Sequence, residues 1–180
     1  VLITETFGVW ALSEGAADDL QQCVQRNLKP NGSLLPESVS LFIAPLSTLP
    51  SSLLSPFQNR FDDVDLSPLL PSARRRSCNF LLADKPYDAQ LIQTLPITEN
   101  VVSSSLQVPF SCQGLALWFD LHFPKDLTLS TGPAAPSTHW KQSLLAVQLP
   151  AGEYAVQAQP APSDRRSCQL QIGSYSFLLR

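Results

Sequence analysis

The sequence predicts a mainly β fold, a barrel or a sandwich, that follows a short α/β segment at the start of the chain. The first observation is the content of 16 prolines among 180 residues, which argues against long helices and favours short strands joined by turns. The second is a series of short apolar runs beyond residue 77, separated by Gly, Pro and Ser. The third is a helical period that follows the first apolar run and ends near residue 32.

The α/β segment begins with the apolar run Val1–Ile3, which predicts a short buried strand. Beyond it, apolar residues recur at steps of three or four, the stripe of an amphipathic helix: Ala17, Leu20, Val24 and Leu28. Lys29–Gly32 contains the Pro and Gly that end the helix, and Leu34–Pro36 and Val39–Ala44 are predicted strands. We therefore expect the end of a parallel sheet at residues 1–32, with β structure beyond it.

Residues 45–76 interrupt the strand pattern with repeated prolines and many apolar side chains. A loop of this length inside a compact domain needs a reason, and its apolar content is too high for a solvated linker. Two interpretations are open: a flap that packs on its own domain, or a projecting arm that is buried in a second subunit. Arg74–Arg76 is an isolated charge run and is predicted to be a solvated turn.

The rest of the chain is predicted to be β. The strand candidates are Cys78–Leu82, Val101–Phe110, Gly114–Phe123, Leu127–Ser130, Gln142–Leu149, Glu153–Ala158 and Gln169–Leu179. Alternation is clearest where Leu115, Leu117 and Phe119 share one face. Trp118, on the other face, is predicted to lie in the core or in a pocket wall, and His122 is predicted to be structural.

Composition excludes several classes of function. The formal net charge is −3, which leaves no electrostatic footprint for nucleic acid. No apolar run reaches membrane-spanning length. The four cysteines show no paired spacing, so neither a metal site nor a disulfide framework is predicted, and a reducing intracellular compartment is the default. The chain opens inside a strand without an initiator Met, so we expect a piece of a longer protein.

Two carboxylates near the start of the chain are candidate site residues. Glu5 follows the first strand and Glu14 precedes the helix, a spacing that suits the two ends of a loop that doubles back, with Gly8 permitting the turn. Two carboxylates on such a loop match the N–H fork of a guanidinium. The alternative is that both are solvated charges at the ends of elements, with Ser13 as the N-cap of the helix.

Three separated motifs resemble the protein arginine N-methyltransferases. Thr4–Gly8, followed by Ser13 and Glu14, resembles the double-Glu loop of that family, whose two Glu have this spacing. Ser137–Gln142, with the sequence Ser-Thr-His-Trp-Lys-Gln, resembles its Thr-His-Trp loop. Between them, Gly114–Asp120 and Leu129–Pro133 resemble the barrel strands that lead into that loop. The order of the motifs agrees, and the resemblance spans nearly the whole chain.

The resemblance implies a division of the chain near residue 33. Residues 1–32 would be the C-terminal end of an S-adenosylmethionine-dependent methyltransferase domain of Rossmann-like α/β type, which is incomplete here. Residues 33–180 would be a β-barrel domain that binds substrate. Residues 45–76, with Val64–Pro68 resembling the sequence of the family at this place, would form a dimerisation arm and give a homodimer or a heterodimer.

The same resemblance assigns roles to four residues. Glu5 and Glu14 would be the catalytic pair that grips the guanidinium of a protein substrate, of Arg/Gly-rich type. His139 and Trp140 would be substrate-binding residues, with His139 shaping the arginine pocket and Trp140 packing its loop. The reaction would be methyl transfer from S-adenosylmethionine to a guanidinium nitrogen, in the cytoplasm or the nucleus.

Departures from the family pattern limit these expectations. Ala16 occupies a position that is often Met in active members, and Val9 one that is often aromatic, so the methylation product is not predicted. The cofactor residues of the family lie upstream, and no Gly-x-Gly loop occurs here, so we assign no cofactor-binding residue and expect this chain alone to be inactive. Two alternatives are a catalytically inactive scaffold or regulatory subunit that acts through dimerisation, and a generic β-barrel binding module.

Overall fold

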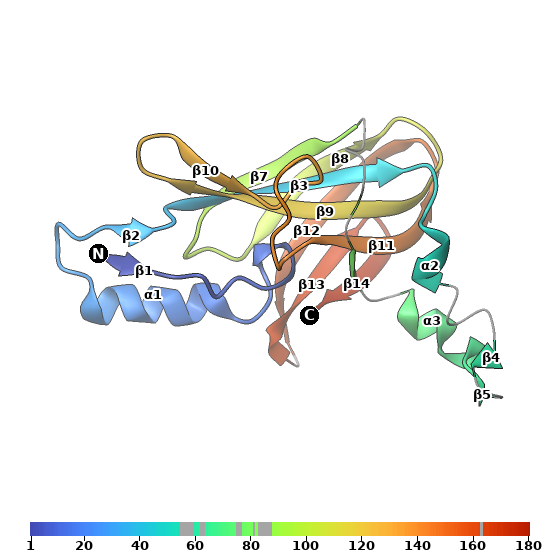
Figure 1. Cartoon of the computed structure of the whole chain (residues 1–180), viewed down its shortest axis with the longest axis horizontal. Coiled ribbons are helices and arrows are strands. Elements are labelled where there is room, and N and C mark those ends of the chain that lie inside the picture. Colours follow the sequence, from blue (N-terminus) through green and yellow to red (C-terminus); the bar gives the residue numbers. More distant parts are fainter. Residues whose placement is uncertain (55–59, 62–63, 75–76, 81, 83–87, 163) are drawn as a thin grey trace.

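The chain begins with a strand, a helix and a second strand that form one unit (Figure 1). The computed structural model describes residues 1–54, 60–61, 64–74, 77–80, 82, 88–162 and 164–180. β1 (Leu2–Ile3) pairs in parallel with β2 (Leu34–Leu35), and α1 (Ala16–Asn27) connects them, which confirms the predicted order. The predicted burial of the first strand is wrong, because Ile3 is exposed and, among the described residues, only β2 pairs with β1.

The amphipathic stripe of α1 packs against the main core as predicted. Ala17 and Leu20 are buried, and Val24 is partly buried against the same cluster. The prediction of Ser13 as the N-cap is wrong, since the cap position is Gly15 and makes no side-chain hydrogen bond. The hydroxyl of Ser13 instead accepts the backbone N–H of Val9 at 2.7 Å, so this serine stabilises the preceding loop.

Two antiparallel sheets make up most of the molecule (Figure 1). The larger has the order β6-β11-β9-β3-β7, with β10 paired to β9, and consists of β3 (Ser38–Leu46), β6 (Cys78–Phe80), β7 (Gln90–Pro96), β9 (Cys112–Phe123), β10 (Leu127–Ser130) and β11 (Gln142–Leu149). The smaller has the order β14-β13-β12-β8 and consists of β8 (Val102–Val108), β12 (Gly152–Ala161), β13 (Asp164–Ile172) and β14 (Tyr175–Leu179).

The two sheets are joined along β7 and β8, which gives the predicted barrel-like architecture. The Ser104 hydroxyl donates to the carbonyl of Ile92 at 2.8 Å, and the backbone N–H of Gln107 donates to the Gln90 side chain at 2.9 Å. The inward faces of both sheets bury one apolar core, with Leu106, Leu115, Leu145, Val156, Leu170 and Ile172 among its fully buried members.

β9 is buried on both faces, and its alternation follows the prediction. Leu115, Leu117 and Phe119 face the main core between the sheets. Ala116 and Trp118 face a second apolar cluster, in which the Trp118 ring is stacked on Phe42 with centroids 5.6 Å apart. Because a central strand with two apolar faces tolerates little displacement, β9 is a rigid support for the loops at its end.

β3 continues to Leu46, so the strand pattern is interrupted after that residue rather than at Pro45 as predicted. The described elements that follow project from one end of the sheets (Figure 1): α2 (Ser51–Leu54), the paired strands β4 (Arg60–Phe61) and β5 (Val64–Asp65), a 3₁₀ turn at Ser67–Leu69, and α3 (Leu70–Ala73). Leu53 of α2 packs into the second apolar cluster, whereas Val64 and Leu69 are exposed. Arg74 is exposed, and Arg75 and Arg76 of the predicted solvated turn lie outside the described residues.

The remaining strand predictions hold with two corrections. The sequence pattern does not predict β7, because its buried residues Ile92 and Leu95 are three apart, and a register shift between β3 and β7 at Leu41 and Phe42 breaks the period of two. The single strand predicted at Gln169–Leu179 is two strands, β13 and β14, which turn at Gly173 with a φ of 57°.

The structure also places the cysteines, His122 and the helices that bear on metal binding and membrane insertion. All four cysteines are free thiols, and the described residues contain no group of three or more His, Cys, Asp and Glu that is placed to hold a metal ion. His122 bonds Ser40 at 2.7 Å and Thr128 at 3.2 Å, which agrees with a structural role. None of the described helices has the length and apolar character needed to span a membrane.

Candidate functional site

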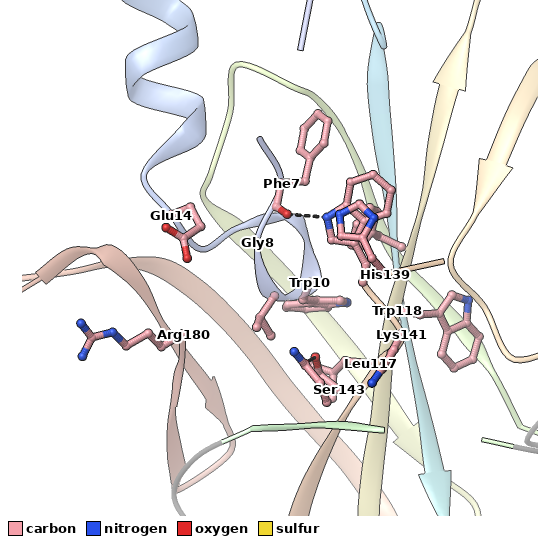
Figure 2. A pocket seen from close by; sticks show the side chains of 14 residues that line it. Phe7, Gly8, Trp10, Glu14, Leu117, Trp118, His139, Lys141, Ser143 and Arg180 are labelled. Carbon is pink, nitrogen blue, oxygen red and sulfur yellow. Dashed lines mark hydrogen bonds between the residues drawn. The ribbon is translucent and has the colours of Figure 1, made fainter. Parts of the chain in front are cut away.

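A pocket of about 230 Å³ lies between the loop at residues 7–14 and the β9–β11 region of the larger sheet (Figure 2). Its walls come from parts of the chain that are far apart in sequence: Phe7, Gly8, Val9, Trp10, Glu14, Asn79, Leu117, Trp118, Phe119, His139, Trp140, Lys141, Ser143 and Arg180. The volume suits a group the size of one side chain and falls below the roughly 300 Å³ at which pockets for whole small molecules begin.

The loop that forms one wall has a tight and unusual backbone. Val9–Ala11 is a 3₁₀ turn in which Trp10 and Ala11 have φ values of 51° and 57°. The Gly8 backbone has a φ of −90°, which any residue can adopt, so its conformation is not the reason for the glycine. A Cβ at Gly8 would lie 2.1 Å from the Ser13 hydroxyl oxygen, so the close approach of Ser13 requires glycine here.

Trp10 attaches this loop to the barrel. Its side chain is 1% exposed, and its Nε1–H donates to the carbonyl of Phe42 on β3 at 3.0 Å. A buried indole with a satisfied N–H combines a large apolar contact with a directional bond. The left-handed backbone at Trp10 is therefore held by the packing and the hydrogen bond of its own side chain.

Trp140 makes a second attachment from the other side of the pocket. Its Nε1–H donates to the carbonyl of Phe7 (Figure 2). The rings of Phe7, Phe119 and Trp140 form an aromatic cluster with centroid separations of 5.7 to 6.5 Å. The His139 ring lies against Trp140 with its centroid 4.0 Å away. The loop that carries His139 is thus coupled to the loop that carries Glu14.

Glu14 ends the first loop with its carboxylate in the pocket wall. Its side chain is exposed, and its backbone has a φ of 75°, a conformation that is uncommon for a residue other than glycine. Its N–H donates to the carbonyl of Arg166 on β13 at 2.6 Å. The lining also includes two cations, Lys141 and Arg180, so the Glu14 carboxylate is the acidic group of this pocket that can accept N–H donors from a planar cation.

The structure brings together three of the four predicted site residues. Glu14, His139 and Trp140 all line the pocket. Glu5 is exposed at the other end of the loop and is not among the lining residues. Of the two departures from the family pattern, Val9 lines the pocket, whereas Ala16 is the first residue of α1 and does not.

Sequence reasoning missed several lining residues. Lys141 belongs to the Thr-His-Trp-Lys-Gln motif and could have been found from it. Asn79 accepts the Ser143 hydroxyl at 3.2 Å, a contact between β6 and β11 that no local pattern indicates. Arg180 reaches the pocket wall from the end of β14, and its Nε lies 3.8 Å from Asp164. These positions depend on strand pairing, which brings distant segments together.

The pocket lined by Glu14 and His139 does not fit S-adenosylmethionine. The pocket has room for one side chain rather than a nucleoside with its amino-acid arm, and its lining has no glycine-rich backbone turn beside a second acidic residue. This pocket is therefore the size of a single side-chain group rather than of a nucleoside cofactor.

A family model described as the arginine methyltransferase oligomerization subdomain matches residues 51–159. Among curated proteins, the chain is 30% identical over 166 residues to protein arginine N-methyltransferase 6 of Xenopus laevis, covering 80% of this chain and 49% of that protein. It is 30% identical over 183 residues to histone-arginine methyltransferase CARMER of Drosophila persimilis, covering 83% of this chain and 33% of that protein. The chain therefore spans between a third and a half of the length of these relatives.

Solved structures share the fold at low sequence identity. The Trypanosoma brucei PRMT1 enzyme–prozyme heterotetrameric complex with AdoHcy gives a TM-score of 0.72 at 19% identity, covering 99% of this chain and 67% of that chain. Protein arginine methyltransferase 10 of Arabidopsis thaliana gives a TM-score of 0.66 at 16% identity, covering 98% of this chain and 69% of that chain. Both similarities extend over the barrel and the preceding strand–helix–strand unit.

Proposed function

We propose that this chain, which belongs to the arginine methyltransferase family, is the C-terminal part of a protein arginine N-methyltransferase. The activity would be transfer of a methyl group from S-adenosylmethionine to a guanidinium nitrogen of a protein arginine. The observation that carries the proposal is a side-chain-sized pocket that Glu14, His139 and Trp140 all line. The curated relatives are named as methyltransferases, which favours the enzyme over a non-catalytic subunit.

The Glu14 carboxylate would hold the substrate guanidinium. A guanidinium spreads its charge over three nitrogens and offers its N–H groups in a planar fork. A carboxylate that accepts two of those N–H groups fixes the plane of the fork and draws positive charge toward itself, away from the nitrogen that reacts. Most of the catalytic gain would then come from orientation and from charge stabilisation.

Trp140 and His139 would bound the plane of the guanidinium. Phe7 and Phe119 meet the Trp140 ring edge to face, at interplanar angles of 62° and 68°, and so hold that ring in place for a planar cation to stack on. Glu5 is assigned the second carboxylate contact by the resemblance of its loop, and the described pocket contributes Glu14 to that pair. The pH profiles of the whole enzyme would identify the carboxylate that accepts the released proton.

The methyl donor would be held by residues outside this chain. The Trypanosoma brucei complex contains AdoHcy, the demethylated form of this donor. The glycine-rich turn that such a cofactor needs is not part of the pocket lining. We therefore infer that residues 1–32 are the end of the donor-binding domain and residues 33–180 are the substrate-binding barrel.

Residues 45–76 would form the dimerisation arm. The matching family model is described as an oligomerization subdomain and begins at residue 51. Val64 and Leu69 are exposed by 56% and 52%, so their apolar side chains are available to a second subunit. The partner would be a second copy or a related subunit, and the substrate an Arg/Gly-rich protein in the cytoplasm or nucleus.

The experiment is labelled-methyl transfer to an Arg/Gly-rich peptide by the full-length protein. Glu14→Gln keeps the size of the side chain and removes its charge, and we expect kcat to fall by about 10²-fold or more. Glu153→Gln on the exposed end of β12 is the matched control and should be neutral. A folded Glu14→Gln protein with wild-type kcat would refute the assignment of Glu14.

A further inference from the structure

The first residues of β13 contact the end of the loop that carries Glu14. The carbonyl of Arg166 accepts the Glu14 N–H at 2.6 Å, across 152 residues of sequence. Because Glu14 has a left-handed φ of 75°, its backbone is in a sparsely populated conformation that needs support from its surroundings. The Arg166 carbonyl is a direct backbone partner that provides such support.

The same residues of β13 pack closely against Gly15, which follows Glu14. A Cβ at Gly15 would lie 2.9 Å from the carbonyl oxygen of Arg165, and Gly15 has a φ of 67°. Two consecutive left-handed residues, Glu14 and Gly15, are therefore enclosed by two consecutive carbonyls of β13. A displacement of the first residues of β13 would move the backbone from which the Glu14 side chain projects.

Asp164 bonds the two residues, Arg166 and Ser167, that flank the carbonyl holding Glu14. Its Oδ1 accepts the Arg166 N–H at 3.0 Å, and its Oδ2 accepts the Ser167 hydroxyl at 2.8 Å. The carbonyl that binds Glu14 belongs to the peptide between these two residues, so both ends of that peptide are attached to one carboxylate. The bonds from Ser167 and Arg166, with the nearby Arg180 charge, lower the pKa of Asp164, so it stays ionised at neutral pH.

We propose that Asp164 is a positioning residue for the Glu14 carboxylate, acting through the orientation of the Arg166 carbonyl. The proposal rests on the proposed function, because it concerns the carboxylate that would hold the substrate guanidinium. Arg180 would be linked to the same network, since it lies 3.8 Å from Asp164 and lines the pocket. Asp164 itself does not line the pocket, so it acts without contact with the substrate.

An ion pair between β13 and α1 distinguishes the positioning role of Asp164 from a general attachment of the helix to the barrel. Arg165 forms an ion pair with Asp19 of α1 at 3.3 Å, and both side chains are well exposed. That pair joins β13 to α1 without involving Glu14 or Asp164. Loss of the ion pair should therefore leave the Glu14 backbone in place, whereas loss of Asp164 should release it.

The test uses the full-length protein and two readouts. The first is hydrogen exchange at the Glu14 amide, measured at residue resolution. The second is kcat for methyl transfer to an arginine peptide. For Asp164→Ala we expect about tenfold faster exchange at Glu14 and a fall in kcat of about tenfold or more, with KM for the peptide changed less. Asp164→Asn retains the Oδ1 acceptor for Arg166 and should restore most of both values.

Asp19→Ala is the matched control and should change neither readout. If Asp164→Ala does not fold, Ser167→Ala removes one of the two bonds of the carboxylate and should accelerate Glu14 exchange in the same direction by a smaller factor. Unchanged exchange and unchanged kcat in the variants would overturn the positioning role. If the wild-type protein transfers no methyl group but Asp164→Ala still accelerates hydrogen exchange at Glu14, the positioning role is supported and the proposed methyl transfer is rejected.

Discussion

The loop at residues 7–14 and the arm at residues 45–76 differ in how far they bury their large apolar side chains. The loop buries Phe7, Trp10 and Leu12 in the main core and is bonded to the barrel through the indoles of Trp10 and Trp140. The described part of the arm buries Leu53 and leaves Val64 and Leu69 exposed. The comparison shows that this chain itself buries the apolar side chains of the loop, whereas the exposed side chains of the arm are those that we propose a second subunit covers.

The largest effect is expected where the loop is most deeply attached. Trp10→Ala removes a side chain that is 1% exposed together with its bond to the Phe42 carbonyl, so unfolding free energy should fall by about 3–5 kcal/mol. Chemical denaturation of the full-length protein would measure it. A loss below about 1 kcal/mol would mean that the loop is not anchored in the core as described.

Trp140→Phe tests the second attachment with a smaller change. The substitution keeps an aromatic ring in the cluster but removes the donor to the Phe7 carbonyl, so we expect a loss of about 1–2 kcal/mol and weaker methyl transfer. His139→Ala removes a neighbouring exposed ring and should leave the unfolding free energy nearly unchanged. If Trp140→Phe and His139→Ala lower the unfolding free energy equally, the hydrogen bond from the Trp140 indole has no special role.

A substitution in the arm should weaken dimer association rather than lower the stability of the folded subunit. Leu69→Ser changes a side chain that is 52% exposed, so the unfolding midpoint of the subunit should move little while the dimer dissociates at higher concentration. Val101→Ser, a similarly exposed apolar residue outside the arm, is the matched control. Sedimentation velocity would separate the two, and identical dimer affinities would remove Leu69 from the interface.

The smallest expected effect is a difference in reactivity between two cysteine thiols, one in the barrel and one just after the arm. Burial raises the pKa of Cys168, on the strand beside the Glu14 loop, to about 12. At about pH 8 this thiol is therefore protonated and should resist alkylation until the protein unfolds. Cys78, just after the arm, is half-buried and should react in the folded state. Mass spectrometry of alkylated peptides would measure both, and rapid labelling of Cys168 would contradict its burial.

Local patterns predicted much of this molecule. The step of three to four apolar residues identified α1, and the period of two identified both faces of β9, because each signal lies within one element. Glu14, His139 and Trp140 were found from short motifs and do meet in one pocket.

Long-range partners could not be predicted from these patterns. The Trp140 indole and the Phe7 carbonyl are 133 residues apart, and their contact depends on how β9 and β11 pair. The register shift between β3 and β7, where Ile92 is the extra residue on β7, concealed that strand, and the space beside Gly8 is filled by a serine that was predicted to cap a helix. In each case tertiary contacts, rather than the local sequence, decide the outcome.

The most direct test of the account is transfer of a labelled methyl group by the full-length protein to two peptides, one Arg/Gly-rich and one with every Arg replaced by Lys. A pocket built for a planar fork of N–H donors predicts label on the arginine peptide alone, as methylarginine, and its loss in Glu14→Gln. Label on the lysine peptide, or methylarginine formed equally well by Glu14→Gln, would contradict the central claim that this pocket holds a substrate guanidinium.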